Sequence, residues 1–586
     1  MLQRPRPYRP IPVLLGLAAL AFVRIAFAAP AGPAPVAAPI ASSVIELQPF
    51  RQVSSGRIES ASGEHGTATL INLNPGINAW YVLSVLWADG SRSSYHLENP
   101  RPHAQRLALD PGFAGGVELL EGAARAPCEL FDNGANDSLA AAAKSSLAYA
   151  SLCAGRLLLR NRVKGHQTRL EAEAEFVRNQ LWGGEKITVL FHHLLSDTHR
   201  ETAALHAAAD YAPAAVETGE EPRPLAAMVD ARYANEVLSA GGLGIPLQGV
   251  RAGLTPGAWY AARDSAGVYV SVLEPQLIDG AILAGNRDRV NTLDSVEASS
   301  LVYLVAFDLD RFDLHYALGT AHPSVEWSEH IPPAMREPKS PGPDDIGTIA
   351  PLVATGQIAP EAAQITVASF TGGFKRAHGA FKYGPLAIVN HASHYGFLEN
   401  GVVLSRLQPE LATLLVLDDG SVQMRTWQAQ DESLLGRIRY ARQNGVPVVE
   451  MDERSQSVPG RWVKEWGPGN WSGSEDMRLR TLRAAAAMQW SASKHFLIYA
   501  VFTDATPSAM ARVFQAYRCR YAMPLDMNAL EHSYLALYRH TGSELQIEYL
   551  LQGMREVDKP DSGPAVPRFL AYPDNRDFFY ITRRGQ

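Results

Sequence analysis

The N-terminal part of the chain shows short runs of apolar and β-branched residues separated by turn residues. Residues 67–73 and 80–87 are such runs, and the turn sequences Asn74-Pro75-Gly76 and Asp89-Gly90 follow them. Strong turn formers between aromatic and β-branched runs are typical of strands joined by tight connections. The pattern predicts a β-rich domain over residues 42–125, a small sandwich or partial barrel.

The pattern becomes helical after residue 132. Residues 138–156 are rich in alanine, and residues 166–181 carry apolar side chains at helical spacing with glutamate and arginine between them. We interpret the acidic residues from Glu171 to Glu175 as a solvated helix face. The sequence thus predicts a helical middle segment within a mixed helical/β accessory region, residues 126–290.

Strand patterns dominate the second half of the chain. Residues 365–370, 411–417 and 497–502 are apolar and β-branched runs, and residues 508–517 follow a Thr-Pro helix start. Few helices are expected between the strands. The pattern predicts a mixed domain with a largely antiparallel sheet over residues 291–586, and the whole chain is expected to be an α+β protein.

The N-terminus has the pattern of a signal peptide. Three arginines precede a mostly apolar run that ends in Ala26-Phe27-Ala28, a suitable cleavage sequence. Arg24 interrupts the run and argues against a permanent anchor; an uncleaved anchor is the alternative. We expect a signal peptide at residues 1–28, an Ala/Pro-rich linker at residues 29–41, and an exported protein, periplasmic or secreted, with no stable membrane span after cleavage.

Composition and charge limit the possible partners. The chain has 586 residues, of which 46% are hydrophobic and 19% charged, which is enough to bury a large core. Cleavage after Ala28 would remove four arginines and take the formal charge from −7 to −11. Nucleic acid attracts basic surfaces. We therefore expect no nucleic-acid partner for a chain this acidic.

The three cysteines are Cys128, Cys153 and Cys519. In an oxidising compartment, Cys128 and Cys153 are the obvious disulfide pair because they close a short local loop. Cys519 is then left over. We expect it in the core, with a reactive thiol between Arg518 and Arg520 as the alternative. Three scattered cysteines give no zinc site, and no cofactor is expected.

The densest candidate chemistry lies in residues 518–539, where two strand-like runs flank a short polar segment. The first run ends in Asp526, and Asn528, Glu531 and His532 follow it. A carboxylate at the end of a hydrophobic run is a candidate for a buried group with a shifted pKa. A turn-forming or capping aspartate is the alternative.

A second candidate stretch ends a predicted strand and contains Thr371, Gly372, Gly373 and Lys375. Paired glycines permit close approach of the backbone to a ligand, and successive N–H groups can form an anion-binding nest. The alternative is a tight structural turn.

A third candidate is Arg483, which precedes the small residues 484–487. Arginine is suited to bidentate binding of phosphate or carboxylate. An ordinary surface arginine is the alternative.

In this order along the chain, the motifs resemble the phosphodiester glycosidase family, relatives of the mannose 6-phosphate uncovering enzyme. The resemblance covers about residues 301–583, the C-terminal half only. Gly372-Gly373-Phe374 matches an N-G-G-F-F-like turn, Arg483 matches the arginine of an R-T-A-I-G-like segment, and Leu525-Asp526 begins an L-D-G-G-G-S-like loop.

The chain also departs from these motifs. Thr371 stands where the family usually has Asn, and Ala487 stands where it has Gly. Met527 and Asn528 replace the glycines after the aspartate, and Glu531-His532 follow where Gly or Ser is expected.

The resemblance implies hydrolysis of a glycosyl phosphodiester or a related cell-envelope glycan linkage. Asp526 would be the nucleophile or base, and Glu531 or His532 a second acid/base. The departing phosphate needs cationic or N–H donors. The substrate-binding residues expected from the motifs are Thr371, Gly372, Gly373, Lys375, Arg483 and Asn528.

Two other functions remain open. One is a non-catalytic envelope or carbohydrate-binding protein that keeps the fold with an altered loop. The other is a metal-dependent hydrolase that uses His378, His391 and His394. The observation that discriminates the enzyme is whether Asp526, Arg483 and Gly372-Gly373 converge on one place.

Overall fold

The computed structural model describes residues 43–132, 138–168, 171–172, 222–250, 253–328, 331–376, 386, 395–465, 478–542, 544–558 and 566–585. The predicted signal peptide and linker lie outside these residues. So do His378, His391 and His394, the histidines considered as metal ligands.

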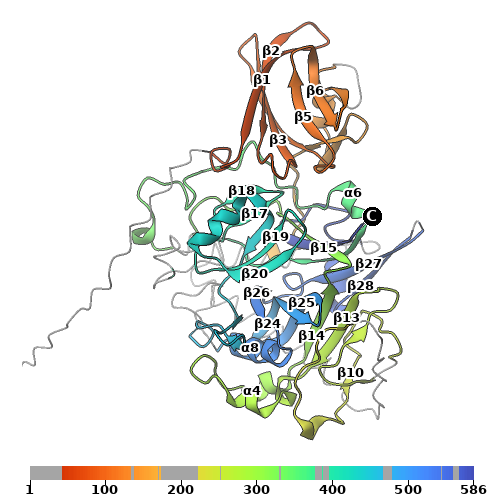
Figure 1. Cartoon of the computed structure of the whole chain (residues 1–586), viewed down its shortest axis with the longest axis vertical. Helices are drawn as coiled ribbons and strands as arrows, with labels where there is room; N and C mark the ends of the chain where they lie inside the picture. The colour runs from red at the N-terminus through yellow and green to blue at the C-terminus, as the bar shows by residue number, and fades with distance from the viewer. Residues whose placement is uncertain are drawn as a thin grey trace, which may run out of the picture. The chain divides into compact units, whose positions relative to one another are not determined.

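The N-terminal strands form two antiparallel sheets with a common core (Figure 1). One sheet has the order β1-β2-β3-β4-β9-β8 and the other has the order β5-β6-β7. Their strands are β1 Gln52–Glu59, β2 His65–Asn72, β3 Trp80–Trp87, β4 Arg92–Glu98, β5 Arg106–Asp110, β6 Phe113–Glu121, β7 Ala124–Glu129, β8 Tyr149–Leu152 and β9 Leu157–Arg160. The shared apolar cluster contains Tyr81, Leu119 and Leu159. The strand pattern predicted here is confirmed; the domain boundaries stay a prediction.

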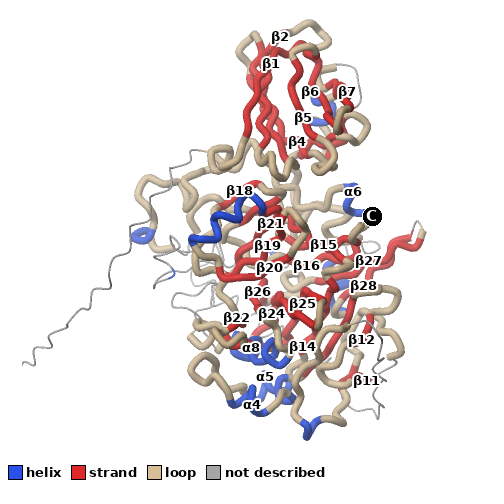
Figure 2. Tube along the Cα trace, viewed as in Figure 1, coloured by secondary structure: helices blue, strands red, loops and turns tan. Residues whose placement is uncertain are grey.

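The predicted helical middle segment, and with it the α+β class, is wrong for the part of the chain that the structure describes; most of the helix expected over residues 166–181 lies outside that part. The described part of the chain is mainly β, with short helices (Figure 2). In the alanine-rich segment only Leu139–Ala143 (α1) is α-helical, and β8 and β9 follow it as an antiparallel pair. Leu152 and Leu157 are buried in the sandwich core. Tertiary burial has overridden the helix propensity of the alanines, which is small per residue.

A disulfide joins Cys128 of β7 to Cys153 in the turn between β8 and β9, with the Cα atoms 5.5 Å apart. It connects the three-stranded sheet to the six-stranded sheet. Cys519 is a free, buried cysteine, and burial raises the pKa of its thiol. This is the core position expected from the sequence.

In the rest of the chain, the described residues build three larger antiparallel sheets and a small one. The strand orders are β12-β13-β14-β25-β24-β26-β22-β23, β15-β29-β16-β27-β28, β18-β17-β21-β19-β20 and β10-β11. The bounds are β10 Leu238–Ser239, β11 Gly253–Leu254, β12 Tyr260–Ala261, β13 Val268–Leu273, β14 Val302–Asp308, β15 Phe312–Ala317, β16 Thr366–Thr371, β17 Phe397–Glu399, β18 Val402–Ser405, β19 Ala412–Leu417, β20 Val422–Thr426, β21 Ile438–Gln443, β22 Val449–Met451, β23 Ser457–Pro459, β24 Thr481–Ser491, β25 Lys494–Ala505, β26 Tyr521–Met527, β27 Leu535–Thr541, β28 Glu544–Tyr549 and β29 Phe578–Arg583. Strands predicted at residues 365–370, 411–417 and 497–502 are confirmed.

Among the described residues of this part, helices are few and short. They are α4 Gly280–Ala284, α5 Ser295–Ser299, α6 Pro360–Ala363 and α8 Pro507–Ala516. The predicted Thr-Pro start of α8 is confirmed: Thr506 is the N-cap, and its side chain accepts a hydrogen bond from the N–H of Ala509. Proline at the first helical position gives up no intrahelical bond.

The loop of residues 528–534 connects two of the sheets. It leaves β26 in the eight-stranded sheet and enters β27 in the five-stranded sheet that also contains β16 and β29. Thr371 at the end of β16 pairs with Phe578 at the start of β29. The end of β26, the end of β16 and the segment before β29 therefore meet, although they lie far apart in the sequence.

Candidate functional site

Asp526 is the carboxylate at the end of β26, and its side chain is buried, with the residue 5% exposed. Its Oδ1 accepts a hydrogen bond from the N–H of Met527 at 2.8 Å, and its Oδ2 accepts one from Arg576 at 2.5 Å. Burial raises the pKa of Asp526 to about 6, although the charge of Arg576 and the Met527 N–H favour the ionised form. The carboxylate therefore changes charge close to neutral pH.

Arg576 is the centre of the site. Besides Asp526, its Nη2 lies 2.7 Å from Nε2 of His532 and 2.7 Å from Oε1 of Glu171. The residue precedes β29, and its backbone N–H donates to Oδ1 of Asp574 at 2.9 Å. The sequence interpretation missed Arg576. The signal was the polar run Asp574-Asn575-Arg576-Asp577, directly before an aromatic strand.

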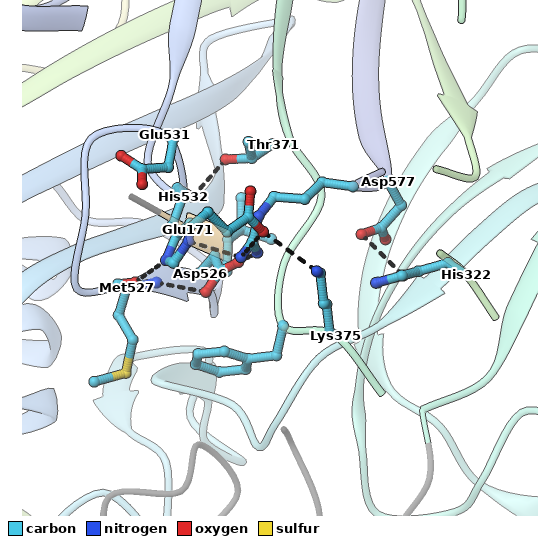
Figure 3. A network of polar contacts seen from close by, with 12 residues as sticks. Glu171, His322, Thr371, Lys375, Asp526, Met527, Glu531, His532 and Asp577 are labelled. Carbon is cyan, nitrogen blue, oxygen red and sulfur yellow. Dashed lines mark hydrogen bonds and ion pairs between the residues drawn. The ribbon is translucent and has the colours of Figure 1, made fainter. Parts of the chain in front are cut away.

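His532 has a defined tautomer. Its Nδ1 lies 2.8 Å from the carbonyl oxygen of Met527, so Nδ1 donates, and Nε2 accepts from Arg576. Thr371 fixes the same residue through the backbone, because its hydroxyl donates to the carbonyl of His532 at 2.6 Å. Thr371 and His532, both predicted site residues, thus lie together beside Asp526 (Figure 3).

Glu171 is the second carboxylate of the site. It is 2% exposed, so its interpretation as part of a solvated helix face is wrong. Its Oε1 lies 3.2 Å from Nζ of Lys375 as well as 2.7 Å from Arg576. Burial works to raise the pKa of Glu171, but the charges of Arg576 and Lys375 outweigh it and hold the pKa well below its usual range. Lys375, predicted from the glycine motif, is thereby brought to the site.

Asp577 anchors the neighbouring buried network. Its Oδ2 accepts from Nε of Arg442 and from the hydroxyl of Tyr316, both at 2.7 Å, and Nδ1 of His322 lies 3.3 Å from its Oδ1. Burial alone would raise the pKa of Asp577, but Arg442 and His322 lower it. Figure 3 shows Lys375 between the Asp577–His322 pair and the Asp526 cluster.

The two glycines of the predicted nest serve close packing. The N–H of Gly372 donates to the carbonyl of Asp577 at 2.9 Å, so this donor is already used. Gly373 has φ +132°, and a Cβ there would lie 2.9 Å from the side chain of Asn444. Asn444 in turn donates to the carbonyls of Pro524 and Leu525, at 2.9 Å and 2.8 Å. The turn thereby ties β16 to β26 just before Asp526.

Arg483 is not brought to Asp526, so the convergence of Asp526, Arg483 and Gly372-Gly373 that was expected to discriminate the enzyme is not found. It pairs with Met527 across β24 and β26, and its Nη1 lies 3.4 Å from the sulfur of Met527. Successive side chains of a strand point to opposite faces, so Asp526 and Met527 lie on opposite faces of the sheet. Arg483, which pairs with Met527, lies on the face opposite to Asp526. Its Nε donates to the carbonyl of Ala505 at 2.7 Å, and burial lowers its pKa to about 10.

Two more predicted residues lie near the loop but contact other groups. Glu531 accepts from the hydroxyl of Thr168 at 3.4 Å, and its carbonyl accepts from Arg568 at 2.7 Å. Asn528, with φ 80°, accepts from the hydroxyl of Thr481 at 2.9 Å. Both residues shape the loop through these contacts.

Among the described residues, no group of three or more His, Cys, Asp or Glu side chains is arranged to hold a metal ion. Within the same residues, no helix is long and apolar enough to cross a membrane.

Comparison with known proteins gives distant similarities. No family model and no curated protein matches the chain. The catalytic domain of zebrafish N-acetylglucosamine-1-phosphodiester alpha-N-acetylglucosaminidase, auto-inhibited by its pro-peptide, is 8% identical with a TM-score of 0.29, covering 55% of this chain and 84% of that one. A Burkholderia pseudomallei protein described as exported is 10% identical with a TM-score of 0.21, covering 48% of this chain and 74% of that one. These TM-scores are too low to assign a fold or an activity.

Proposed function

We propose that the chain is an exported hydrolase that cleaves a glycosyl phosphodiester or a related anionic cell-envelope glycan linkage. The observation that carries this proposal is the pairing of a buried carboxylate of raised pKa, Asp526, with a cluster of cations. Arg576 bonds Asp526 directly, and Arg576 and Lys375 both contact Oε1 of Glu171. Perturbed carboxylates beside specific charge partners are typical of catalytic sites.

The chemistry requires one group for the sugar carbon and others for the leaving phosphate. Hydrolysis breaks the bond between C1 and the phosphate oxygen, water supplies the new hydroxyl, and a phosphomonoester departs. In its ionised form Asp526 is the nucleophile, or the base that takes the proton of water. Arg576 and Lys375 take the place that the motif resemblance gave to Arg483, and stabilise the developing phosphate charge.

His532 positions the guanidinium of Arg576. Its Nδ1–H is fixed by Met527, and its Nε2 accepts from the same guanidinium nitrogen that contacts Glu171. This contact orients Arg576 toward Asp526. His532 is thus a positioning residue in the proposal, although the sequence suggested an acid/base.

The test is turnover of a panel of sugar 1-phosphodiesters by the wild type and by Asp526→Asn. We expect Asp526→Asn to lower kcat at least about 100-fold, in the range typical of acid/base and nucleophile loss. The wild-type rate should rise through about pH 6 as Asp526 ionises. Unchanged hydrolysis in the variant would end the proposal.

Asp558→Asn is the matched control. Asp558 is also buried with a pKa raised to about 6, but its carboxylate accepts from the hydroxyls of Tyr534 and Tyr549, both at 2.9 Å. It should keep turnover once folded, as judged by circular dichroism. Binding of the panel without turnover by the wild type would favour the non-catalytic glycan-binding alternative.

A further inference from the structure

The position of Glu171 has no role in the proposed chemistry. Its carboxylate is an anion from a distant segment, and it contacts Arg576 and Lys375, the two cations assigned to the substrate phosphate. Figure 3 shows Glu171 and Lys375. The charges of Arg576 and Lys375 keep it ionised despite its burial. The cation pair therefore already holds an oxyanion.

The hydrogen bonding of Glu171 differs from that of a fitted structural carboxylate. Within the described part of the chain, neither Oε1 nor Oε2 of Glu171 has a hydrogen-bond partner of good geometry. Nearby Asp574, in contrast, accepts two bonds from Arg568, at 2.7 Å and 3.1 Å. A buried carboxylate normally has its lone pairs satisfied. Glu171 is held by charge, so an oxyanion with better-placed oxygens can replace it.

The attachment of Glu171 to the site is local and polar. Its N–H donates to the hydroxyl of Thr168 at 3.1 Å, and that hydroxyl contacts Glu531. His166 exchanges backbone bonds with the segment before Arg576, at 2.7 Å to Pro573 and 3.0 Å from Asn575. These contacts place the carboxylate beside Lys375 and Arg576.

We propose that Lys375 and Arg576 form an oxyanion subsite for a phosphate group, and that Glu171 is its internal occupant when no ligand is bound. Binding of the phosphate displaces the Glu171 carboxylate. The identity of this ligand as the substrate rests on the proposed function; the subsite itself does not.

The experiment is calorimetric titration of the full chain with inorganic phosphate at constant ionic strength. Removing the internal carboxylate by Glu171→Ala should tighten phosphate binding at least tenfold, and phosphate should raise the Tm of the variant in a saturable way. Equal affinity in wild type and variant, or no binding by either, would overturn the proposal. If Glu171→Ala does not fold, the isosteric Glu171→Gln carries the same titration, because it removes the charge and keeps the volume.

Two further arms separate the subsite from general effects. The double variant Glu171→Ala/Lys375→Met should bind phosphate no more tightly than the wild type. Tighter phosphate binding by this double variant would contradict the assigned cation pair. Glu297→Ala is the control: this buried carboxylate accepts from the N–H of Thr506 at 2.7 Å, and its removal should create no phosphate binding. Formate is titrated in parallel, and tight formate binding without phosphate binding would overturn a phosphate subsite.

The readout is independent of hydrolysis. Phosphate binding by Glu171→Ala with no turnover of any sugar phosphodiester would leave the subsite standing and remove the proposed function. Turnover that depends on Asp526, together with equal phosphate affinity in the wild type and Glu171→Ala, would leave the proposed function standing and remove the subsite.

Discussion

Two buried clusters in this protein each place an arginine between two carboxylates, but they differ in how fully the carboxylates are hydrogen-bonded. In the Arg160 cluster, the guanidinium lies between Glu98 and Glu399, at 2.5 Å and 3.2 Å, and over the ring of Trp80 at 4.2 Å. In the Arg576 cluster, the guanidinium lies between Asp526 and Glu171, at 2.5 Å and 2.7 Å. An arginine between two carboxylates is therefore not by itself the mark of a functional site.

The difference lies in the remaining hydrogen bonds. In the Arg160 cluster, Glu399 also accepts from the N–H of Leu318 at 3.0 Å, and Glu98 accepts from the indole of Trp80 at 3.1 Å. Arg160 itself donates to the carbonyl of Val353 at 3.1 Å. These bonds fix β4 and β9 of the sandwich against β17, and the Arg160 cluster is a structural junction.

The Arg576 cluster has a second cation and a carboxylate without matched donors. Lys375 adds charge on one side, and Glu171 contributes an oxyanion that no hydrogen bond fixes within the described residues. Buried polar groups that are only partly satisfied are costly. Proteins retain such groups mainly at functional sites, and this imbalance is what distinguishes the site from the junction.

The largest effect should come from replacing each arginine by methionine. Arg160→Met leaves Glu98 and Glu399 buried without their cation, and should lower the free energy of unfolding by about 3–5 kcal/mol. Arg576→Met should lower it by less than half as much, because Lys375 still faces Glu171 and leaves that carboxylate a second cation. Urea denaturation at pH 7 measures both.

Arg437→Met is the control for this pair, since Arg437 bonds Asp418 and Asp419 on the surface. Exposed ion pairs contribute little, so it should be close to neutral. Equal losses at Arg160 and Arg576 would contradict the distinction between junction and site.

An intermediate effect is expected in the pH dependence of stability. Burial raises the pKa of Glu399 to about 7, above its unfolded value, even though Arg160 opposes the shift. The folded state then binds this proton more tightly than the unfolded state does. The contribution of Glu399 to the free energy of unfolding is therefore full below about pH 4.5 and is lost as the pH rises through about 7. At about 1.4 kcal/mol per pKa unit, we expect a loss of about 1–3 kcal/mol.

Glu399→Gln should flatten this decline between pH 5 and 8, measured as urea midpoints across that range. Asp526→Asn should flatten only the part that ends near pH 6, because the pKa of Asp526 is raised to about 6. The junction and the site would thus be separated by the pH at which each responds. An unchanged slope in Glu399→Gln would show that Glu399 is not the group responsible.

The smallest effects should separate structure from function most cleanly. Tyr149→Phe removes a hydroxyl that donates to the carbonyl of Gln357 at 3.1 Å, and Thr371→Val removes the one that donates to His532. Each should cost about 1 kcal/mol of stability. Only Thr371→Val should also lower turnover, several-fold, because His532 positions Arg576. Stability and turnover are measured on the same preparations. A matching loss of turnover in Tyr149→Phe would contradict the assignment of the Arg160 cluster as a structural junction.

Much of the site was visible in the sequence. A hydrophobic run that ends in aspartate predicted a buried carboxylate, and Asp526 is one. His532 and Thr371, also predicted, lie beside Asp526, and Lys375 reaches the same cluster through Glu171. Arg483 was named on motif grounds, but the alternation of side chains along β26 puts it on the opposite face from Asp526.

Arg576 and Glu171 could not be found in the same way. Arg576 precedes β29, which reaches Asp526 only through the pairing of β16 with β29. Glu171 sits among alternating alanines and glutamates that carry the local signal of a solvated helix. Neither residue has a neighbour in sequence that reports its partners.

The sequence by itself determined the strands, because side-chain alternation and turn residues are local properties. It also determined the Thr-Pro start of α8 and the chemical character of the loop after β26. Only the tertiary structure decided that the alanine-rich residues 138–156 are α-helical at Leu139–Ala143 alone, because burial against the sandwich outweighs small propensities. It alone also decided which arginine meets Asp526, because that depends on the joining of two sheets through the loop of residues 528–534.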